Sequence, residues 1–224
     1  MYMPNAGDRN NLTKRNNIIK VYGEGEIAVQ PDTATVNLGV VTESKELMEA
    51  QQQNSIIANK VINALIALGI DKNQIQTVEY RIEPEYDYSS GQQIFRGYKI
   101  THILQVKIDD LSIIGKVVDT GVENGANYVA NVLFTSKYKE AYYQQALAMA
   151  LNNASNKAKT IANTIQVTLN PTPILVVERG DTIQPFESQH VAFAKGVSST
   201  PIQPGQLLIR ASVSTEYRYS SING

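Results

Sequence analysis

Apolar and polar residues alternate along much of this chain. In residues 18–29 (IIKVYGEGEIAV) every second position is apolar or glycine, which is the period of a β-strand. Pro31 and Asp32 then form a turn signal, and residues 33–42 alternate again. The pattern predicts two strands that pair as an antiparallel N-terminal β-hairpin.

The next segment has the spacing of an amphipathic helix. Apolar residues recur every three or four positions through residues 45–68, and Gly69 follows as a stop signal. Residues 76–88 and 98–108 return to alternation and are predicted to be strands. The glycine-containing stretch at residues 89–97 (SSGQQIFRG) is predicted to connect them.

The strand predicted at residues 76–88 has one apolar and one charged face. Its apolar positions are Val78, Tyr80, Ile82, Pro84 and Tyr86, and its charged positions are Glu79, Arg81, Glu83, Glu85 and Asp87. Paired carboxylates can bind hard cations or act as acids and bases. Calcium, however, needs roughly 6 to 8 oxygens around it, whereas a straight strand sets same-face residues in a row about 6.5 to 7 Å apart. We therefore interpret these acidic residues as a solvated strand face.

A second helix and a further strand complete a repeated pattern. Residues 111–124 have helical spacing and residues 128–135 read as a strand. The order strand, helix, strand therefore occurs twice, in residues 33–87 and 98–135. The predicted fold class is α+β with a βαββαβ core.

The last part of the chain adds a long third helix and C-terminal strands. Residues 138–165 have mostly small residues at the inward helical positions, so another helix could approach closely, and this face could be a packing or subunit surface. A short strand is predicted at residues 174–178, and a long Gly-, Pro- and Ser-containing loop at residues 179–205. Residues 206–219 alternate again and should return to a mixed sheet.

The bulk composition fits a globular protein. The chain has 224 residues, of which 42% are hydrophobic and 18% charged, which is enough apolar material to bury a core. We expect a disordered polar tail at residues 1–17. A single domain is expected at residues 18–220, with the loop at 179–205 flexible.

Charge and cysteine content exclude several classes of function. The net charge is −1 with basic residues spread along the chain, which argues against a nucleic-acid partner. The absence of cysteine excludes disulfides, thiolate nucleophiles and the usual structural zinc sites. No stretch approaches the roughly 20 apolar residues that span a bilayer, and residues 1–17 hold no signal-peptide run. The sequence thus predicts a cytoplasmic protein without a transmembrane segment, export being the alternative if a signal was removed.

One segment matches the letters of a dinucleotide-binding fingerprint. Residues 23–28 (GEGEIA) fit GxGxxA, in which glycines let backbone amides approach a pyrophosphate at a helix start. Here the match lies inside a predicted strand, and Glu24 and Glu26 would repel phosphate. We interpret Gly23 and Gly25 as relieving crowding or permitting a bulge.

The two histidines do not suggest a site. His102 lies on an apolar strand face and His190 in the long loop. Metal or triad chemistry would require both to converge with a carboxylate or a serine such as Ser188, and no spacing supports this. We interpret His102 as a core histidine. The sequence predicts no catalytic, cofactor-binding or metal-binding residue, and no cofactor.

Several segments resemble the SIMPL-domain family. In order they are IKVYGEGE at 19–26, VQPD at 29–32, QTVEY at 76–80, FRGY at 95–98, GVENGAN at 121–127 and KAK at 157–159. The resemblance implies a protein without an agreed enzymatic activity. It also implies kinship with bacterial periplasmic immunogenic proteins, some of them linked to oxidative stress tolerance, and with an animal kinase-binding protein. Some bacterial relatives assemble into ring-like or channel-like homo-oligomers.

These observations predict a non-enzymatic protein that assembles with itself. The candidate surfaces are the sheet edges, the small-residue face of the third helix and the loop at residues 179–205. Twelve tyrosines without a tryptophan also favour sheet packing and interfaces. The alternative is a module that binds a heterologous protein or small ligand through that loop. An enzyme ranks last, because no nucleophile, base and orienting group can be named together.

Overall fold

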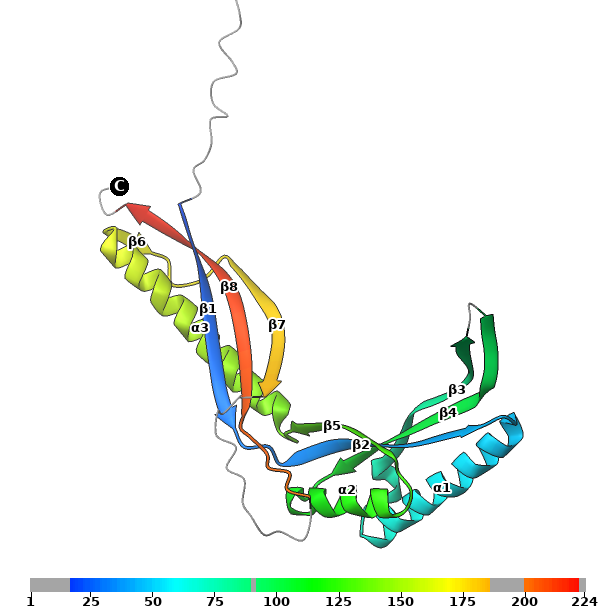
Figure 1. Cartoon of the computed structure of the whole chain (residues 1–224). Helices are drawn as coiled ribbons and strands as arrows, with labels where there is room; N and C mark the ends of the chain where they lie inside the picture. Colours follow the sequence, from blue (N-terminus) through cyan, green and yellow to red (C-terminus); the bar gives the residue numbers. More distant parts are fainter. Residues whose placement is uncertain (1–16, 90–91, 186–199, 222–224) are drawn as a thin grey trace, which may run out of the picture. The chain divides into compact units, whose positions relative to one another are not determined.

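The computed structural model describes residues 17–89, 92–185 and 200–221 (Figure 1). The fold is α+β, and the described strands form two antiparallel sheets. The chain divides into two compact units. Of the described residues, unit 1 comprises 17–29, 138–184 and 208–221, and unit 2 comprises 30–89, 92–137, 185 and 200–207.

Unit 2 contains the repeated strand, helix, strand pattern. Its main elements are β2 (Thr33–Ser44), α1 (Leu47–Ala67), β3 (Ile75–Ser89), β4 (Gln92–Ile108), α2 (Ile114–Glu123) and β5 (Tyr128–Thr135). Short 3₁₀ turns precede β3 (Lys72–Gln74) and α2 (Leu111–Ile113). The strands lie in the order β3-β4-β2-β5, and each neighbour pair is antiparallel. The predicted order of the βαββαβ core is confirmed.

Large aliphatic residues form the core of unit 2. On β2, alternate residues from Ala34 to Val40 are at most 1% exposed, as periodicity predicted. Helix α1 contributes Val61 and Leu65 to the same cluster, and α2 contributes Ile114 and Val117. Both helices therefore bury their apolar faces against the sheet.

In unit 1 the first described strand of the chain lies beside the last one. It contains β1 (Ile18–Val29), α3 (Lys139–Thr164), β6 (Val167–Leu169), β7 (Leu175–Pro185) and β8 (Leu207–Ser221). The sheet order is β1-β8-β6, and β7 also pairs with β8. The C-terminal strand thus returns to a sheet as predicted. In this unit, α3 lies along β1 (Figure 1).

The small-residue face of α3 is a packing surface within the chain. Its buried members are Ala146, Ala150, Ala154, Ala158 and Ala162, all at most 1% exposed. A strand lies against this face, whereas the sequence suggested another helix or a subunit. The reason lies on β1, where Gly23 and Gly25 have no side chain to hold α3 away. This face of α3 is therefore already covered within the chain.

Strand pairing differs from the prediction in two respects. β1 and β2 are consecutive strands, but β1 pairs in the sheet with β8 and β2 pairs with β4 and β5. The strands also form two antiparallel sheets instead of one mixed sheet. Alternation within a strand identifies its buried face but carries no information about its neighbour, because the neighbour is distant in sequence.

Two predicted loops are shorter than expected. β4 begins at Gln92, so most of the predicted connection at residues 89–97 is strand. β7 runs to Pro185, so the loop predicted to start at residue 179 begins with strand, while residues 186–199 lie outside the described residues. At its far end Thr200 donates to Asp119 through its backbone N–H (3.1 Å). The prediction was wrong at both places because polar and glycine residues, which are common in loops, here lie in strands.

Candidate interaction surface

The segment that matched a dinucleotide fingerprint is a packing site. An added Cβ at Gly23 would lie 2.0 Å from the carbonyl oxygen of Ala150, and one at Gly25 would lie 2.1 Å from that of Ala146. Glu24 and Glu26 point to the exposed side of β1. The glycines therefore relieve crowding beneath α3, in agreement with the interpretation from the sequence.

Three acidic residues on the charged face of β3 form ion pairs with neighbouring cations. Arg81 forms ion pairs with Glu79 (3.0 Å) and Glu83 (3.1 Å) on the same strand. On β4, Lys99 and Arg96 lie 3.6 Å and 3.9 Å from the carboxylate of Glu85. Across the described part of the chain, no group of three or more acidic or histidine residues is arranged to hold a metal ion. These carboxylates form a charged strand surface.

His102 packs against the edge strand β3. Its Nε2 atom lies 3.0 Å from the hydroxyl of Thr77, and its ring meets that of Tyr80 edge-on at 5.2 Å. Burial lowers the pKa of His102 from its ordinary value of 6.5. Within the described residues the buried Nδ1 atom has no hydrogen-bond partner, so no third group orients the ring as in a triad. His190 and Ser188 lie outside the described residues.

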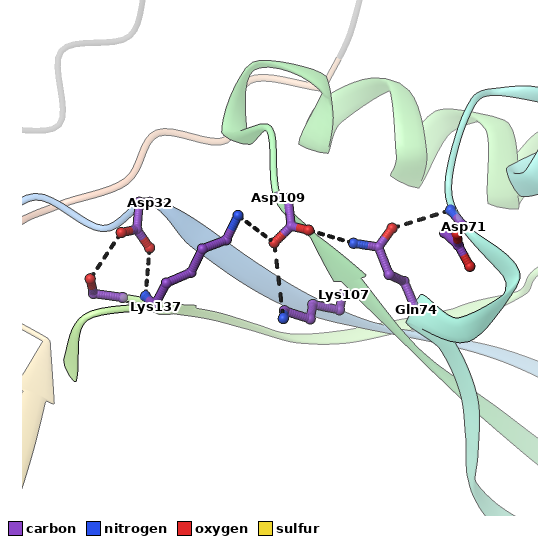
Figure 2. Close-up of polar contacts among 7 residues, drawn as sticks. Asp32, Asp71, Gln74, Lys107, Asp109 and Lys137 are labelled. Carbon is purple, nitrogen blue, oxygen red and sulfur yellow. Dashed lines mark hydrogen bonds and ion pairs between the residues drawn. The ribbon is translucent and has the colours of Figure 1, made fainter. Parts of the chain in front are cut away.

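A polar cluster that the sequence did not suggest surrounds Asp109 (Figure 2). Lys137 Nζ lies 3.1 Å and Lys107 Nζ 4.0 Å from Asp109 Oδ1. Gln74 Nε2 donates to the other carboxylate oxygen of Asp109 at 2.6 Å. One carboxylate thus holds side chains from three separate segments of unit 2.

The same cluster extends to both sides of Asp109 (Figure 2). Gln74 Oε1 accepts from the backbone N–H of Asp71 (3.1 Å) as part of a capping box, whose Asp-x-x-Gln spacing is readable in the sequence. Asp32 accepts from the Ser136 hydroxyl (3.0 Å) and the Lys137 backbone N–H (2.8 Å). Because its polar groups satisfy one another, we interpret the cluster as a structural clamp on the connections of unit 2.

The β3–β4 hairpin continues beyond the rest of its sheet. The last residue pair between β2 and β4 is Ser44 with Tyr98. Beyond it, residues 85–89 of β3 pair only with residues 92–97 of β4, and we call this two-stranded part the arm. Figure 1 shows the far end of the β3–β4 hairpin standing apart from β2 and α1.

One face of this hairpin is apolar and exposed. We call it the aromatic face, and its members are Tyr80 (45% exposed), Ile82 (40%), Tyr86 (42%), Tyr88 (80%) and Phe95 (45%). On the arm, the Phe95 ring contacts those of Tyr86 (5.7 Å) and Tyr98 (5.2 Å) edge to face. Such pairs order the side chains across the ribbon without removing them from water.

The aromatic face is a continuation of the core face of the sheet. Ile100, which is 0% exposed, and Tyr98 lie on the same face of β4 as the packed aromatic rings. Helix α1 starts at Leu47, immediately after β2 ends, and covers the sheet only from that level inward. The apolar pattern therefore runs further along β3 and β4 than the helices that cover it.

Ion pairs hold the base of the arm on its opposite face. Arg96 bridges Glu43 of β2 (3.6 Å) and Glu85 of β3 (3.9 Å). Gly97 packs closely on β2, since an added Cβ there would lie 2.7 Å from the carbonyl oxygen of Ser44. The arm therefore leaves the sheet in a defined direction. The sequence predicted the alternation on β3 and a solvated charged face, but it did not predict that the apolar face is exposed as well.

The fold and this surface define an α+β protein with a candidate interaction surface. The SIMPL family model, described as a protein of unknown function (DUF541), matches residues 19–217, and the chain belongs to this family. The match spans both compact units. The resemblance found in the sequence is thereby confirmed.

Curated relatives match part of the chain. It is 31% identical over 130 residues to the 26 kDa periplasmic immunogenic protein of Brucella melitensis, covering 56% of this chain and 52% of that protein. It is 26% identical over 107 residues to the uncharacterized protein YggE of Escherichia coli K12, covering 48% and 44%. The chain thus matches about half the length of these relatives.

The comparisons correct one prediction about location. The Brucella relatives are named periplasmic proteins, so the expectation of a cytoplasmic protein is contradicted and export is favoured. Neither the family description nor the relatives' names give an enzyme activity. Among the helices that the structure describes, none is long and apolar enough to cross a membrane.

Proposed function

We propose that this protein is an exported, non-enzymatic SIMPL-domain protein that assembles with itself through the aromatic face of the β3–β4 hairpin. The observation that carries the proposal is the row of large apolar side chains on the β3–β4 hairpin that stay 40% to 80% exposed. Monomeric soluble proteins rarely expose contiguous apolar patches larger than a few hundred Å², and aromatic residues are enriched at interfaces.

The physical state of the arm supports the same proposal. An isolated two-stranded ribbon is only marginally stable in water, and it needs a third strand or a packed face for independent stability. Here ion pairs hold only the base of the arm, at Arg96 and Lys99. Packing against a partner would bury the exposed rings of Tyr86, Tyr88 and Phe95 and stabilise the ribbon.

A second copy of the chain fits this surface. β3 ends the sheet order β3-β4-β2-β5, so its outer edge faces no other strand of that sheet. Two copies related by a two-fold axis could join these edges, since the same patch then serves both. An antiparallel pairing centred on Ile82 would set Arg81 and Glu83 of the two copies opposite one another, which places opposite charges side by side.

Absolute mass by light scattering behind a sizing column tests the proposal. The wild-type protein should have a discrete multiple of 24.7 kDa that persists on dilution. The triple variant Tyr86→Ser, Tyr88→Ser and Phe95→Ser should have a lower mass, because it removes the apolar area of the arm. A wild-type protein that is monomeric at every concentration would contradict self-assembly.

The matched control changes exposed apolar residues on the opposite edge of the same sheet. Tyr128 and Leu133 on β5 are 45% and 57% exposed. The double variant Tyr128→Ser and Leu133→Ser should keep the wild-type mass. If the arm variant keeps the wild-type mass, the aromatic face is excluded as the assembly surface. If the mass falls equally in the arm variant and the control, the effect of the substitutions is nonspecific.

Export and stress tolerance are separate parts of the proposal. Export is supported by the periplasmic names of the Brucella relatives, and fractionation of cells that express the complete gene tests it. Retention of the product in the cytoplasmic fraction would contradict it. We propose any part in oxidative stress tolerance as an indirect result of assembly, and the chain has no cysteine thiol that could react with an oxidant.

A further inference from the structure

The β1 edge is a place where a further strand could add. β1 is a 12-residue strand at one end of the sheet order β1-β8-β6. The outward N–H and C=O groups of an edge strand are a template for a strand from another chain. Proteins that remain discrete need a way to close such an edge.

Two side chains of α3 bond to the backbone edge of β1. Lys157 Nζ donates to the carbonyl oxygen of Tyr22 at 2.8 Å. The backbone N–H of Glu24 donates to Asn153 Oδ1 at 3.3 Å. Asn153 and Lys157 are four residues apart, so they lie on the same side of the helix.

The side chains of Asn153 and Lys157 make the two hydrogen bonds that one backbone residue of an added strand would make. In a parallel pair of strands, one residue donates to a carbonyl and accepts from the N–H two residues further along its partner. Lys157 supplies the donor to Tyr22 and Asn153 the acceptor from Glu24. A strand that added here in parallel register would have to displace both side chains.

The glycines of β1 make this arrangement geometrically accessible. The backbone of α3 approaches Gly23 and Gly25 so closely that an added Cβ would lie within 2.1 Å of a helix carbonyl oxygen. This close approach lets side chains of α3 reach the strand edge. The GEGE segment and the polar residues of α3 therefore act together.

A similar arrangement occurs in unit 2. Just before β5 begins beside β2, Asn127 Nδ2 donates to the carbonyl oxygen of Val41 (2.7 Å), and the N–H of Val41 donates to Asn127 Oδ1 (2.8 Å). Here one side-chain amide replaces a strand residue in antiparallel pairing. Side-chain groups thus occupy strand-edge positions in both units.

We propose that Asn153 and Lys157 close the β1 edge against strand addition by a second copy of this chain. We call them the seal. Their removal would leave the carbonyl group of Tyr22 and the N–H group of Glu24 available to another strand. The inference concerns unit 1 alone and does not depend on assembly through the aromatic face. In the assembly proposed above, they would exclude β1 as a competing contact.

The double variant Asn153→Ala and Lys157→Met tests the seal. Amide hydrogen exchange at Glu24, followed by NMR, should quicken about two- to tenfold, because one hydrogen bond is lost. Light scattering should show a mass that rises with concentration above that of the wild-type protein. The comparison is with the wild-type mass, so it can be read whether the wild type is a monomer or an oligomer.

The matched control is Asn152→Ala with Lys159→Met, two exposed positions on the same helix. It should keep the wild-type mass and the wild-type exchange at Glu24. Unchanged exchange in the test variant would overturn the seal, as would faster exchange with an unchanged mass. If the double variant loses its circular dichroism signal, Lys157→Met alone decides the question, since this exposed side chain contributes little to the core.

Discussion

The two units of this protein cover their sheets with helices in different ways. In unit 2, large residues such as Leu38 and Leu65 fill the space between sheet and helix. In unit 1, glycines on β1 face alanines on α3, and the backbones themselves come close. The helix–sheet interface of unit 2 depends on large side chains, whereas that of unit 1 depends on residues with little or no side chain.

The difference extends to the surfaces that each unit exposes. Close approach in unit 1 lets α3 side chains bond to the β1 edge. In unit 2, large side chains separate the helices from the sheet. Helix α1 does not cover the arm, so the apolar face of the sheet continues there into solvent. The comparison teaches that the apolar face of a sheet becomes available to a partner where the helices no longer pack on it, even though the apolar pattern of the strands continues.

The largest expected effect comes from removing volume in unit 2. Leu38 is 0% exposed, and Leu38→Ala should lower the free energy of unfolding by about 2 to 5 kcal/mol through the cavity it leaves. Urea unfolding followed by circular dichroism measures this, and residue-resolved hydrogen exchange should place the loss in unit 2. Leu133→Ala, at a position 57% exposed, is the control and should cost much less. Equal losses would contradict the volume-based interface.

The next effect comes from adding volume in unit 1. Gly25→Val should cost about 1 to 3 kcal/mol, because its side chain meets the helix backbone, which yields less easily than a side chain. The same unfolding and exchange measurements apply, with the loss expected in β1 and α3. Ala28→Val, on the exposed side of β1, should be nearly neutral. A tolerated Gly25→Val would show that the close approach is not required.

A smaller effect should depend on pH. Burial lowers the pKa of His102 below 6.5, so the unfolded chain takes up a proton more readily than the folded one. Stability should therefore fall as pH drops below 6.5, and it should level off below the folded pKa. Urea unfolding at a series of pH values should show a weaker pH dependence for His102→Gln. The same slope in both proteins would assign the dependence to other groups.

The smallest effect on stability should come from the tip of the aromatic face. Tyr88 is 80% exposed, so Tyr88→Ser should change the free energy of unfolding of the dissociated chain by no more than about 0.5 kcal/mol. The same substitution should weaken assembly, measured as a lower mass on dilution. A large loss of stability with unchanged mass would show that Tyr88 packs within the chain.

Much of the fold could be predicted from local patterns. The strand at residues 128–135 was predicted with its observed bounds, and the three helices were found within a few residues, because apolar periodicity reflects which side each residue buries. The long β4 and the extension of β7 were missed. Their polar and glycine-containing residues have the composition of a loop, and composition alone does not separate such a strand from a loop.

The candidate surface was predicted only in part. Alternation on β3 identified Tyr80, Ile82 and Tyr86 as one apolar face, but it could not show that this face stays exposed on an edge strand. The cluster around Asp109 joins residues from positions 74, 107 and 137, and its members have no common local signal apart from the capping box.

By itself, the sequence determined the α+β class, the family, the order of elements and the absence of cysteine chemistry. Each of these depends on composition or on residues that are neighbours along the chain. Only the tertiary structure decided which strands pair, why β1 carries two glycines, and that the apolar face of the arm is exposed. These features depend on which distant segments cover a surface, and a local pattern states only that a face is apolar.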